Sequence, residues 1–169
     1  MIGSVEPRKN HALVLDVFEQ LWSEGINARL VIVGKHGWHS ENLLRRMEKH
    51  EQLNKNLFYL KNACDTTLIA LYAGTQAVIM ASMAEGFGLP IVEALRNGSK
   101  VICNDIAVFR ELAGISENLK FFNENSRSDL LVVLKNDMPK ITGAQNEEVK
   151  YSWISWRESA VQLITAIKK

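Results

Sequence analysis

The sequence carries almost no net charge. It contains 20 lysine and arginine residues against 19 aspartate and glutamate residues, a formal charge of +1. Such a balance provides no overall field that would gather nucleic acid or an anionic membrane surface. We therefore exclude nucleic acid as a partner, while a local site for an anion is still compatible with the composition.

Cysteine is scarce, and long apolar runs are missing. The two cysteines, Cys64 and Cys103, have no metal-ligand spacing and suit a reducing compartment, so we expect both to be buried free thiols. No apolar stretch approaches the length of a membrane span, and the first residues lack the basic and apolar pattern of a signal peptide. These observations predict a soluble, cytoplasmic chain.

Short apolar runs are plentiful, by contrast. At 169 residues, 47% of them hydrophobic, the sequence can build one core, and we expect a single domain over residues 1–169. β-Branched and apolar runs predict strands over residues 28–33, 56–60, 77–81, 100–103 and 119–122, after a first strand that is cut short before Gly3. Helical periodicity predicts helices over residues 11–23, 40–50, 67–73, 90–97, 108–113, 126–135 and 151–168. Ser40, and either Asp65 or Thr66, are expected to cap two of them.

The alternation of strands and helices predicts a doubly wound α/β fold with a parallel sheet. In such sheets ligands bind at the carboxyl ends of the strands. The loops after the strands are therefore where a functional site is expected. His11 would face this edge from the start of the first helix, whereas His36 and His39, beside Trp38 in a loop, are of a kind that is more often solvated than ligand-binding.

The loop after residues 77–81 contains the most specific motif. ASMAEGFGLPIVEAL, residues 81–95, places Gly86, Gly88 and Pro90 at the start of a helix, between Glu85 and Glu93. The first N–H groups of a helix lack partners within it, and glycine lets a phosphate approach the backbone closely, so this turn can bind an anion. Carboxylates accept hydrogen bonds from sugar hydroxyls. We therefore predict that the amides bind phosphate and that the two glutamates bind hydroxyl groups on either side of it.

Cations for such a phosphate occur near the start of the sequence. In GSVEPRKNH, residues 3–11, Arg8 and Lys9 follow the first strand and so lie at the same edge of the sheet as the glycine turn. Plainer explanations exist: an Arg-Lys pair is usually solvated, and a glutamate near a helix N-terminus gains about 0.3–1 kcal/mol whatever its function. The combination with the glycines and Pro90 favours a ligand site. The sequence has neither a P-loop nor a GxGxxG pattern, which argues against a kinase or a dehydrogenase.

These residues resemble the C-terminal, donor-binding half of retaining glycosyltransferases with the GT-B fold. That family has two glutamates separated by seven residues around a glycine turn, here EGFGLPIVE from Glu85 to Glu93, and a basic pair after its first strand, here Arg8 and Lys9. VIVGKHGW, VFREL and SWRESA also occur in the family's order, so the resemblance covers nearly the whole chain. In detail the sequence is most similar to bacterial mannosyltransferases that build O-antigen or related surface polysaccharides.

The resemblance implies a role for each of these residues. Arg8, Lys9 and Glu85 would be catalytic: the cations would stabilise the diphosphate as the sugar leaves, and Glu85 would bond sugar hydroxyls. Glu93 would bond the ribose, and a loop after a strand would lie near the base. The other implied substrate-binding residues are Gly86, Phe87, Gly88, Leu89, Asn62 and Ala63. The donor substrate would be a nucleotide diphosphate sugar, with no metal and no further cofactor.

The resemblance also implies an N-terminal domain that binds the glycan acceptor, for which the sequence has no counterpart. Residues 151–168 would form a helix that crosses back to that domain, with Trp153 and Trp156 either partly exposed or ordinary core aromatics. We expect the isolated chain to bind donor without efficient transfer, and the full-length enzyme to be cytoplasmic or at the inner face of the cell membrane. Ser4 stands where many relatives have arginine, and Arg8 would substitute for it.

Three hypotheses about the function of the chain, from different classes of protein, remain compatible with the sequence. The leading one is a retaining transfer of a hexose, mannose from GDP-mannose, to a growing polysaccharide or lipid-linked glycan. The second is a nucleotide-sugar-binding or regulatory module without catalysis, against which the presence of both glutamates and of the basic pair argues. The third is an unrelated flavodoxin-like binding domain, which would not require the basic pair and the glutamates to converge in space.

Overall fold

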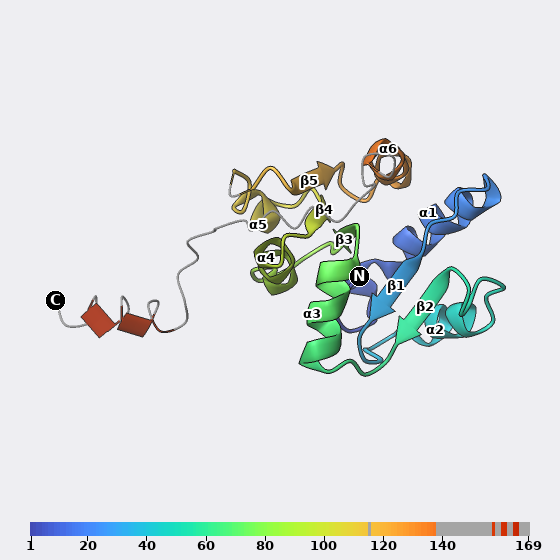
Figure 1. Ribbon diagram of the computed structural model, residues 1–169, viewed down its shortest axis with the longest axis horizontal. Helices are drawn as coiled ribbons and strands as arrows, with labels where there is room; N and C mark the ends of the chain where they lie inside the picture. The colour runs from blue at the N-terminus through green and yellow to red at the C-terminus, as the bar shows by residue number, and fades with distance from the viewer. Residues whose placement is uncertain (115, 138–156, 158–159, 162–163, 166–169) are drawn as a thin grey trace.

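Short strands alternate with helices in the computed structural model, which describes residues 1–114, 116–137, 157, 160–161 and 164–165 (Figure 1). The strands are β1 (Leu30–Val33), β2 (Leu57–Leu60), β3 (Ala77–Met80), β4 (Lys100–Asn104) and β5 (Leu119–Phe122). The helices are the 3-10 helix η1 (Pro7–Lys9), α1 (His11–Ser23), α2 (Glu41–Glu48), α3 (Asp65–Gly74), α4 (Leu89–Arg96), α5 (Ala107–Arg110) and α6 (Arg127–Asp137). Most of the expected final helix, including Trp153 and Trp156, lies outside the described residues.

Every strand pair in the described part of the chain is parallel. β1 pairs with β2 in one sheet, and β3, β4 and β5 pair in that order in a second. Residues Ile2 and Val5 form isolated parallel bridges with Val33 and His36, and Figure 1 shows the N-terminus between β1 and β3. The single sheet that the sequence predicts is thus formed as two parallel sheets, because segment 1–5 contributes bridges rather than a strand.

Alternate residues of the central strands pack into different apolar cores. On one face, Ile79 of β3 and Ile102 of β4 pack with side chains of α1 and α6. On the other face, Val78 and Met80 of β3 and Val101 of β4 pack with side chains of α3, α4 and α5. Since successive side chains of a strand point to opposite faces, helices cover both faces of β3 and β4. This arrangement confirms the predicted doubly wound α/β fold.

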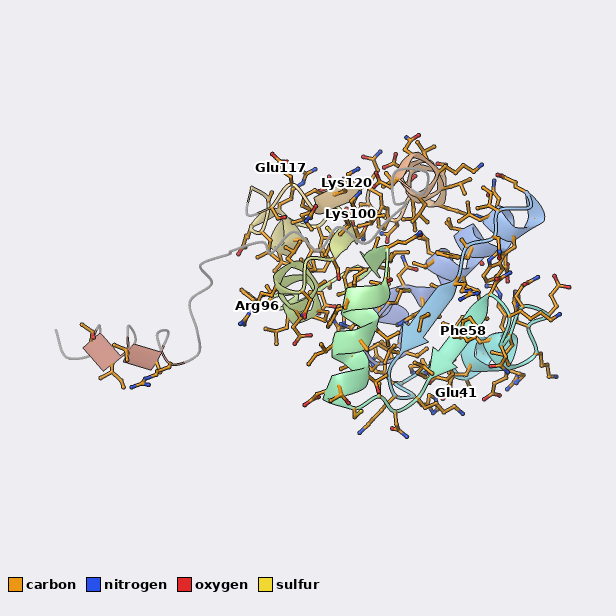
Figure 2. The ribbon with its side chains drawn as sticks, in the orientation of Figure 1. Glu41, Phe58, Arg96, Lys100, Glu117 and Lys120 are labelled. Atoms are coloured by element: carbon orange, nitrogen blue, oxygen red, sulfur yellow. The ribbon has the colours of Figure 1, made fainter. Side chains whose placement is uncertain are left out.

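Charged side chains lie on the outside of the molecule. Figure 2 shows Glu41, Arg96 and Glu117 pointing away from the strands, and all three residues are exposed. Among the described helices, none combines the length and the apolar character needed to cross a bilayer.

The first two helices begin where the sequence predicts or one residue later. α1 occupies the predicted range, and Gly25, with φ of +79°, follows it and donates its N–H to the Trp22 carbonyl. Ser40 is the N-cap residue of α2, as expected. Its hydroxyl, however, donates to the carbonyl of Gly37 at 2.9 Å rather than accepting from the helix, so it stabilises the preceding loop.

The start of α3 and the environment of Cys64 differ from expectation. The helix begins at Asp65 with Cys64 as its N-cap residue, so the prediction that Asp65 or Thr66 caps it was wrong. The reason is local: Cys64 is extended, and its carbonyl accepts the first helical bond from the N–H of Leu68 at 3.0 Å. Cys64 is therefore exposed at the helix end, contrary to the expected buried thiol, whereas Cys103 is buried and both are free.

Candidate functional site

The predicted site residues lie in connections at the carboxyl ends of the strands. Arg8 and Lys9 belong to η1, which follows segment 1–5. Residues 81–88 connect β3 to α4, and Asn62 and Ala63 lie between β2 and α3. Because all the strands run in parallel, these connections share one edge of the fold, as predicted.

Glu85 binds both residues of the basic pair. One carboxylate oxygen lies 2.5 Å from Nζ of Lys9, and the other lies 2.9 Å from Nη1 of Arg8. Arg8 also reaches Glu6, whose Oε1 is 2.6 Å from its Nη2. The side chains of Lys9 and Glu85 are only 12% and 10% exposed, so this pair is shielded from solvent. Two cations and two carboxylates therefore form a compact cluster whose formal charges balance.

The contacts set the ionisation of the cluster. Partial burial acts to raise the pKa of Glu85, but hydrogen bonds from Lys9, Ser82 and Arg8 and the charge of Lys9 outweigh it, and the pKa lies below its ordinary value. The hydrogen bond to Glu85 is the largest contribution that raises the pKa of Arg8. The carboxylate of Glu85 is therefore charged at neutral pH, and the guanidinium of Arg8 keeps its proton.

Backbone contacts fix the loops that carry this cluster. The carbonyl of Arg8 accepts the N–H of Met83 at 2.9 Å, and Nη1 of Arg8 donates to the carbonyl of Ala84 at 2.7 Å. Asn104 at the end of β4 is fully buried and donates through Nδ2 to the carbonyl of Ser82 at 3.1 Å. The loop after β3 is thus tied both to η1 and to the neighbouring strand, which orients Glu85 toward the basic pair.

The glycine turn that follows Glu85 has an unusual backbone. Gly88 is the N-cap residue of α4 with φ of +92°, a left-handed conformation that glycine adopts without strain. A Cβ at Gly88 would lie 2.8 Å from the ring of the buried Phe109, whereas a Cβ at Gly86 would meet nothing within 4 Å. α4 begins at Leu89, one residue before Pro90, which occupies the first turn as expected. The side chains of Phe87 and Leu89 are about half exposed.

The second glutamate has a different partner from the first. Glu93 is exposed on α4 and accepts a hydrogen bond of 2.9 Å from the hydroxyl of Tyr72 on α3. Burial and this bond raise the pKa of Tyr72, so its hydroxyl stays a donor. Asn62 is exposed and Ala63 is partly buried. The structure therefore brings together Arg8, Lys9 and Glu85, while Glu93 is held by Tyr72 instead.

Two partners of the predicted residues were missed from the sequence. Glu6 stands two positions before Arg8 in EPRKN, a spacing that could have suggested the ion pair. Tyr72 lies four positions after Leu68, a spacing that places both residues on the same face of α3. Both side chains pack into the core that α4 also contacts, and this spacing is the sequence signal for Tyr72. Neither partner could be assigned from sequence alone, because the contacts depend on how η1 and α3 approach the loop after β3.

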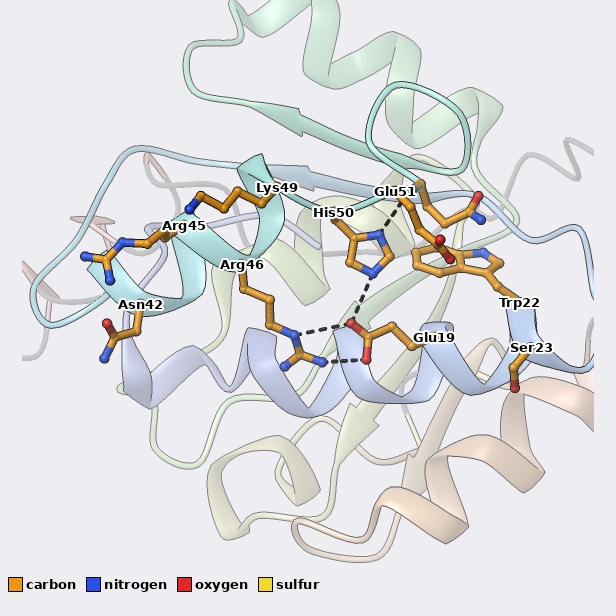
Figure 3. A pocket seen from close by; sticks show the side chains of 10 residues that line it. Glu19, Trp22, Ser23, Asn42, Arg45, Arg46, Lys49, His50 and Glu51 are labelled. Carbon is orange, nitrogen blue, oxygen red and sulfur yellow. Dashed lines mark hydrogen bonds and ion pairs between the residues drawn. The ribbon is translucent and has the colours of Figure 1, made fainter.

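A separate hollow lies between α1 and α2. Its volume is about 840 Å³, and Figure 3 shows Glu19 at its centre between Arg46 and His50. Arg46 lies 2.6 Å from Glu19 and 2.5 Å from Asp16, and His50 lies 3.0 Å from Glu19. These side chains bind one another, so the groove offers little that is specific to a ligand. Over the described residues, no group of His, Cys, Asp and Glu is placed to hold a metal ion.

Comparison with known families identifies the class of protein. Residues 1–130 match the family described as "Glycosyl transferases group 1". This match covers well over half of the chain and includes the basic pair, the glycine turn and both glutamates. The chain therefore belongs to the group 1 glycosyltransferases, as the sequence predicted.

Several relatives have assigned activities. The chain is 41% identical over 165 residues to the serotype-specific mannosyltransferase WbdA of Escherichia coli, which is 97% of this chain and 20% of that protein. It is 28% identical over 170 residues to the O-antigen chain mannosyltransferase B of Escherichia coli, covering 99% of this chain and 44% of the relative. The chain thus spans from a fifth to less than half of the length of these mannosyltransferases.

Solved structures confirm the fold class. The sucrose-phosphate synthase of Thermosynechococcus elongatus superposes with a TM-score of 0.79 at 17% identity, over 99% of this chain and 44% of that one. Anabaena Alr3699/HepE in complex with UDP and glucose superposes with a TM-score of 0.70 at 19% identity, over 98% of this chain and 47% of that one. At these identities the likeness concerns the fold, which is that of a GT-B glycosyltransferase half.

Proposed function

We propose that this chain is the donor-binding domain of a retaining glycosyltransferase that transfers mannose from GDP-mannose to a growing polysaccharide or lipid-linked glycan. The observation that carries the proposal is the convergence of Arg8 and Lys9 on Glu85 beside the glycine turn that starts α4. Membership of the group 1 family and the similarity to mannosyltransferases support the enzyme class and the sugar.

Donor binding would exchange partners within the cluster. The diphosphate of a nucleotide sugar competes with Glu85 for the two cations, and the backbone amides of Gly86, Phe87, Gly88 and Leu89 supply further donors at the positive end of α4. A carboxylate released from a cation becomes a strong acceptor for hydroxyl groups of the transferred sugar. On this proposal Glu93 binds the ribose, and Asn62 and Ala63 line the base.

The transfer itself follows from where charge develops. The bond between the anomeric carbon and the β-phosphate oxygen breaks, and its electron pair stays on the departing nucleoside diphosphate. The acceptor hydroxyl bonds to the anomeric carbon from the same face and gives its proton to the departing phosphate oxygen. Arg8 and Lys9 stabilise the growing charge on the phosphate, which is the main barrier, so neither a metal nor a protein nucleophile is required.

An N-terminal domain would supply the acceptor glycan and complete the cleft. The chain spans less than half of its mannosyltransferase relatives, which supports a partner domain of this kind. Residues 151–168 would cross to it. On this proposal the full-length enzyme acts in the cytoplasm or at the inner face of the cell membrane.

Calorimetric titration of the chain tests the donor. GDP-mannose and GDP are expected to bind, and UDP-glucose and ADP-glucose to bind at least tenfold more weakly, a difference of about 1.4 kcal/mol. Lys9→Ala and Glu93→Ala are each expected to weaken GDP-mannose binding by roughly tenfold. Lys49→Ala, which removes an exposed cation directly after α2, is the matched control and is expected to change nothing.

The outcomes separate the hypotheses. Tight binding of a uridine or adenosine ligand would leave the assignment as a glycosyltransferase in place and would overturn the assignment of GDP-mannose as the donor. Equal effects of Lys49→Ala and Lys9→Ala would refute the assigned site. An inactive nucleotide-sugar module would bind donor normally, yet the full-length protein carrying this domain would transfer no sugar.

A further inference from the structure

Three asparagines from separate parts of the chain meet at the carboxyl ends of the strands. Asn10 joins η1 to α1, Asn104 is the last residue of β4, and Asn125 lies between β5 and α6. Nδ2 of Asn10 donates to Oδ1 of Asn125 at 3.1 Å, and the N–H of Asn125 donates to Oδ1 of Asn104 at 3.0 Å. Nδ2 of Asn104 also approaches Oδ1 of Asn125, at 3.5 Å. The three residues therefore form one hydrogen-bonded group, which we call the asparagine cluster.

Asn104 is the buried member of the asparagine cluster. It is fully buried, and its strand β4 lies between β3 and β5 in the second sheet (Figure 1). Its Nδ2 donates to the carbonyl of Ser82 in the loop after β3, and its Oδ1 accepts from Asn125 in the loop after β5. Buried amides are stable where their hydrogen bonds are made. The burial of Asn104 therefore requires both neighbouring loops to keep their places.

The asparagine cluster is connected to both sides of the ion pair between Lys9 and Glu85. On one side, Asn10 directly follows Lys9 in the sequence. On the other side, Asn104 binds the carbonyl of Ser82, and the buried side chain of Ser82 forms a hydrogen bond with Glu85. The contact of 2.5 Å between Lys9 and Glu85 closes this path into a ring. A change in the cluster should therefore alter the spacing between the cation and the carboxylate.

Backbone conformation alone does not explain these contacts. Asn10 has φ of +53° and Asn125 has φ of +55°, and asparagine adopts this left-handed conformation more readily than most residues. Asn54, an exposed residue between α2 and β2, has φ of +61°, yet no described residue forms a hydrogen bond with its side chain. A left-handed asparagine thus needs no side-chain partner, so the contacts of Asn10 and Asn125 are additional to what their turns require. Asn104 lies in a strand and has no such backbone reason.

We propose that Asn104 and Asn125 are positioning residues that hold the basic pair and Glu85 at the spacing required for the diphosphate of the donor. Asn104 acts through Ser82 on the loop that carries Glu85, and Asn125 acts through Asn10 on η1. The inference rests on the proposed function, because it concerns the same diphosphate site. It gives a role to the loop after β5, which contains none of the predicted site residues.

Binding of GDP-mannose to glycine variants tests this role. Glycine keeps the left-handed backbone and the main-chain N–H at positions 10 and 125, and removes only the side-chain contacts. Asn10→Gly and Asn125→Gly are each expected to weaken GDP-mannose binding roughly fivefold, the equivalent of about one hydrogen bond. Because the two variants lose a shared contact, the double variant is expected to bind no more weakly than Asn125→Gly. Asn54→Gly makes the same change outside the cluster and is the control, which is expected to bind as the parent does.

The pKa of Glu85 in the ligand-free chain is a readout that a purely structural role would not change. Nuclear magnetic resonance of the side-chain carboxyl carbons, recorded as the pH is lowered, measures it. Asn125→Gly is expected to raise the pKa of Glu85 toward its ordinary value, because Lys9 and Ser82 then hold the carboxylate less closely. Asn54→Gly is expected to leave this pKa unchanged. If Asn125→Gly lowered only the urea midpoint of unfolding, with the pKa of Glu85 and the GDP-mannose affinity as in the parent, the proposal would be overturned.

The two readouts separate this inference from the proposed function. If the parent chain does not bind GDP-mannose, the donor proposal fails, and the pKa comparison still decides whether the asparagine cluster positions Glu85. If the parent binds GDP-mannose while Asn125→Gly and Asn54→Gly share its affinity and its Glu85 pKa, only the positioning role fails. Effects of Asn10→Gly and Asn125→Gly that multiply in the double variant would contradict a single cluster.

Discussion

Glu85 is the residue through which the two cations are held in one place. With its side chain 10% exposed and both oxygens engaged, it satisfies Lys9 and Arg8 together. Removing it would leave Lys9, only 12% exposed, without its carboxylate. A charged group that is shielded from water and lacks a partner destabilises the folded state. Both the stability of the fold and the proposed binding site should therefore depend on Glu85.

We expect Glu85→Gln to lower the free energy of unfolding at pH 7 by about 1–3 kcal/mol, because hydrogen bonds to charged groups are lost. The pKa of Glu85 is below its ordinary value of 4.5 in the folded state, so on acidification the unfolded chain takes up this proton first. The contribution of Glu85 is therefore full above pH 4.5 and is lost as pH falls through the folded-state pKa.

Urea unfolding of both proteins from pH 7 down to pH 3 measures this difference. The gap between the parent and Glu85→Gln should narrow as the pH falls below the ordinary glutamate value. Glu117→Gln, which removes an exposed carboxylate, is the control and should follow the parent throughout. A gap that stays constant with pH would contradict the assigned ion pairs.

The two cysteines should differ sharply in reactivity. Hydrogen bonds from the side chains of Thr66 and Thr67 are the main cause that lowers the pKa of the exposed Cys64 to about 7, whereas burial raises that of Cys103 to about 12. We expect iodoacetamide to alkylate Cys64 with a pH midpoint of about 7 and to leave Cys103 unmodified in the folded chain. Mass spectrometry of timed reactions measures both rates.

The threonine contribution can be tested in the same assay. Thr66→Val should move the midpoint for Cys64 upward toward the ordinary thiol value. Equal labelling of the two cysteines under native conditions would contradict the described burial.

At the scale of elements, the start of α4 requires glycine at position 88 but not at position 86. Gly88 combines φ of +92° with close contact to the buried ring of Phe109, whereas Gly86 has open space where a Cβ would stand. The N-terminus of α4 is therefore placed by the packing of α5 as well as by its own sequence. Any residue larger than glycine at position 88 would move either the turn or the aromatic ring.

We expect Gly88→Ala to destabilise the fold by about 1–3 kcal/mol, since a residue held in a sparsely populated conformation carries a cost of this size before the clash is added. Gly86→Ala is the matched control and should unfold at nearly the parent's urea concentration. Denaturation of the two variants side by side measures the contrast. Similar midpoints would show that the turn relaxes freely, against its described packing.

The elements themselves were largely predictable. Period-two and helical patterns place β3, β4 and α1 within a residue or two of their observed bounds, because apolar side chains of these elements must reach the cores. Errors arose where a local contact decides the boundary of an element. The carbonyl of Cys64 accepts the first helical hydrogen bond, so α3 begins two residues before the predicted position 67.

The convergence of Arg8 and Lys9 with Glu85 could also be expected, since parallel strands end at one edge. The individual partners could not be predicted: Glu85 binds the cations directly and Glu93 binds Tyr72. Such side-chain contacts depend on the backbone conformation of the loops.

At the scale of the whole molecule, the candidate site joins the parts of the fold. β1 and β2 form one sheet and β3, β4 and β5 form another, with segment 1–5 between them. Arg8, on η1 after this segment, bonds to Ala84 and to Met83 in the loop after β3, and Asn10 donates through its side chain to Asn125 after β5. A ligand that binds this cluster would therefore hold both sheets at once.

Donor binding should accordingly stabilise the entire fold without metal. With GDP-mannose at 100 times its dissociation constant, we expect the free energy of unfolding to rise by about 2.7 kcal/mol, as binding to the folded state alone requires. Addition of EDTA should leave this increase unchanged, because amides and cations of the chain are proposed to bind the diphosphate. Urea unfolding with and without EDTA measures both effects, and a loss of stabilisation with the chelator would argue for a metal.

The carboxylate of Glu85 has a consequence for the crowded anion pool of a cell. Because it is tethered within 2.9 Å of both cations, it acts as a permanent internal competitor at a high effective concentration. On the proposed function, a small anion such as free phosphate would have to displace Glu85 using charge alone, whereas a nucleotide sugar would also bring the base, the ribose and a sugar whose hydroxyls would bind the released carboxylate. The ion pair would thereby discriminate against simple metabolite anions at the binding step.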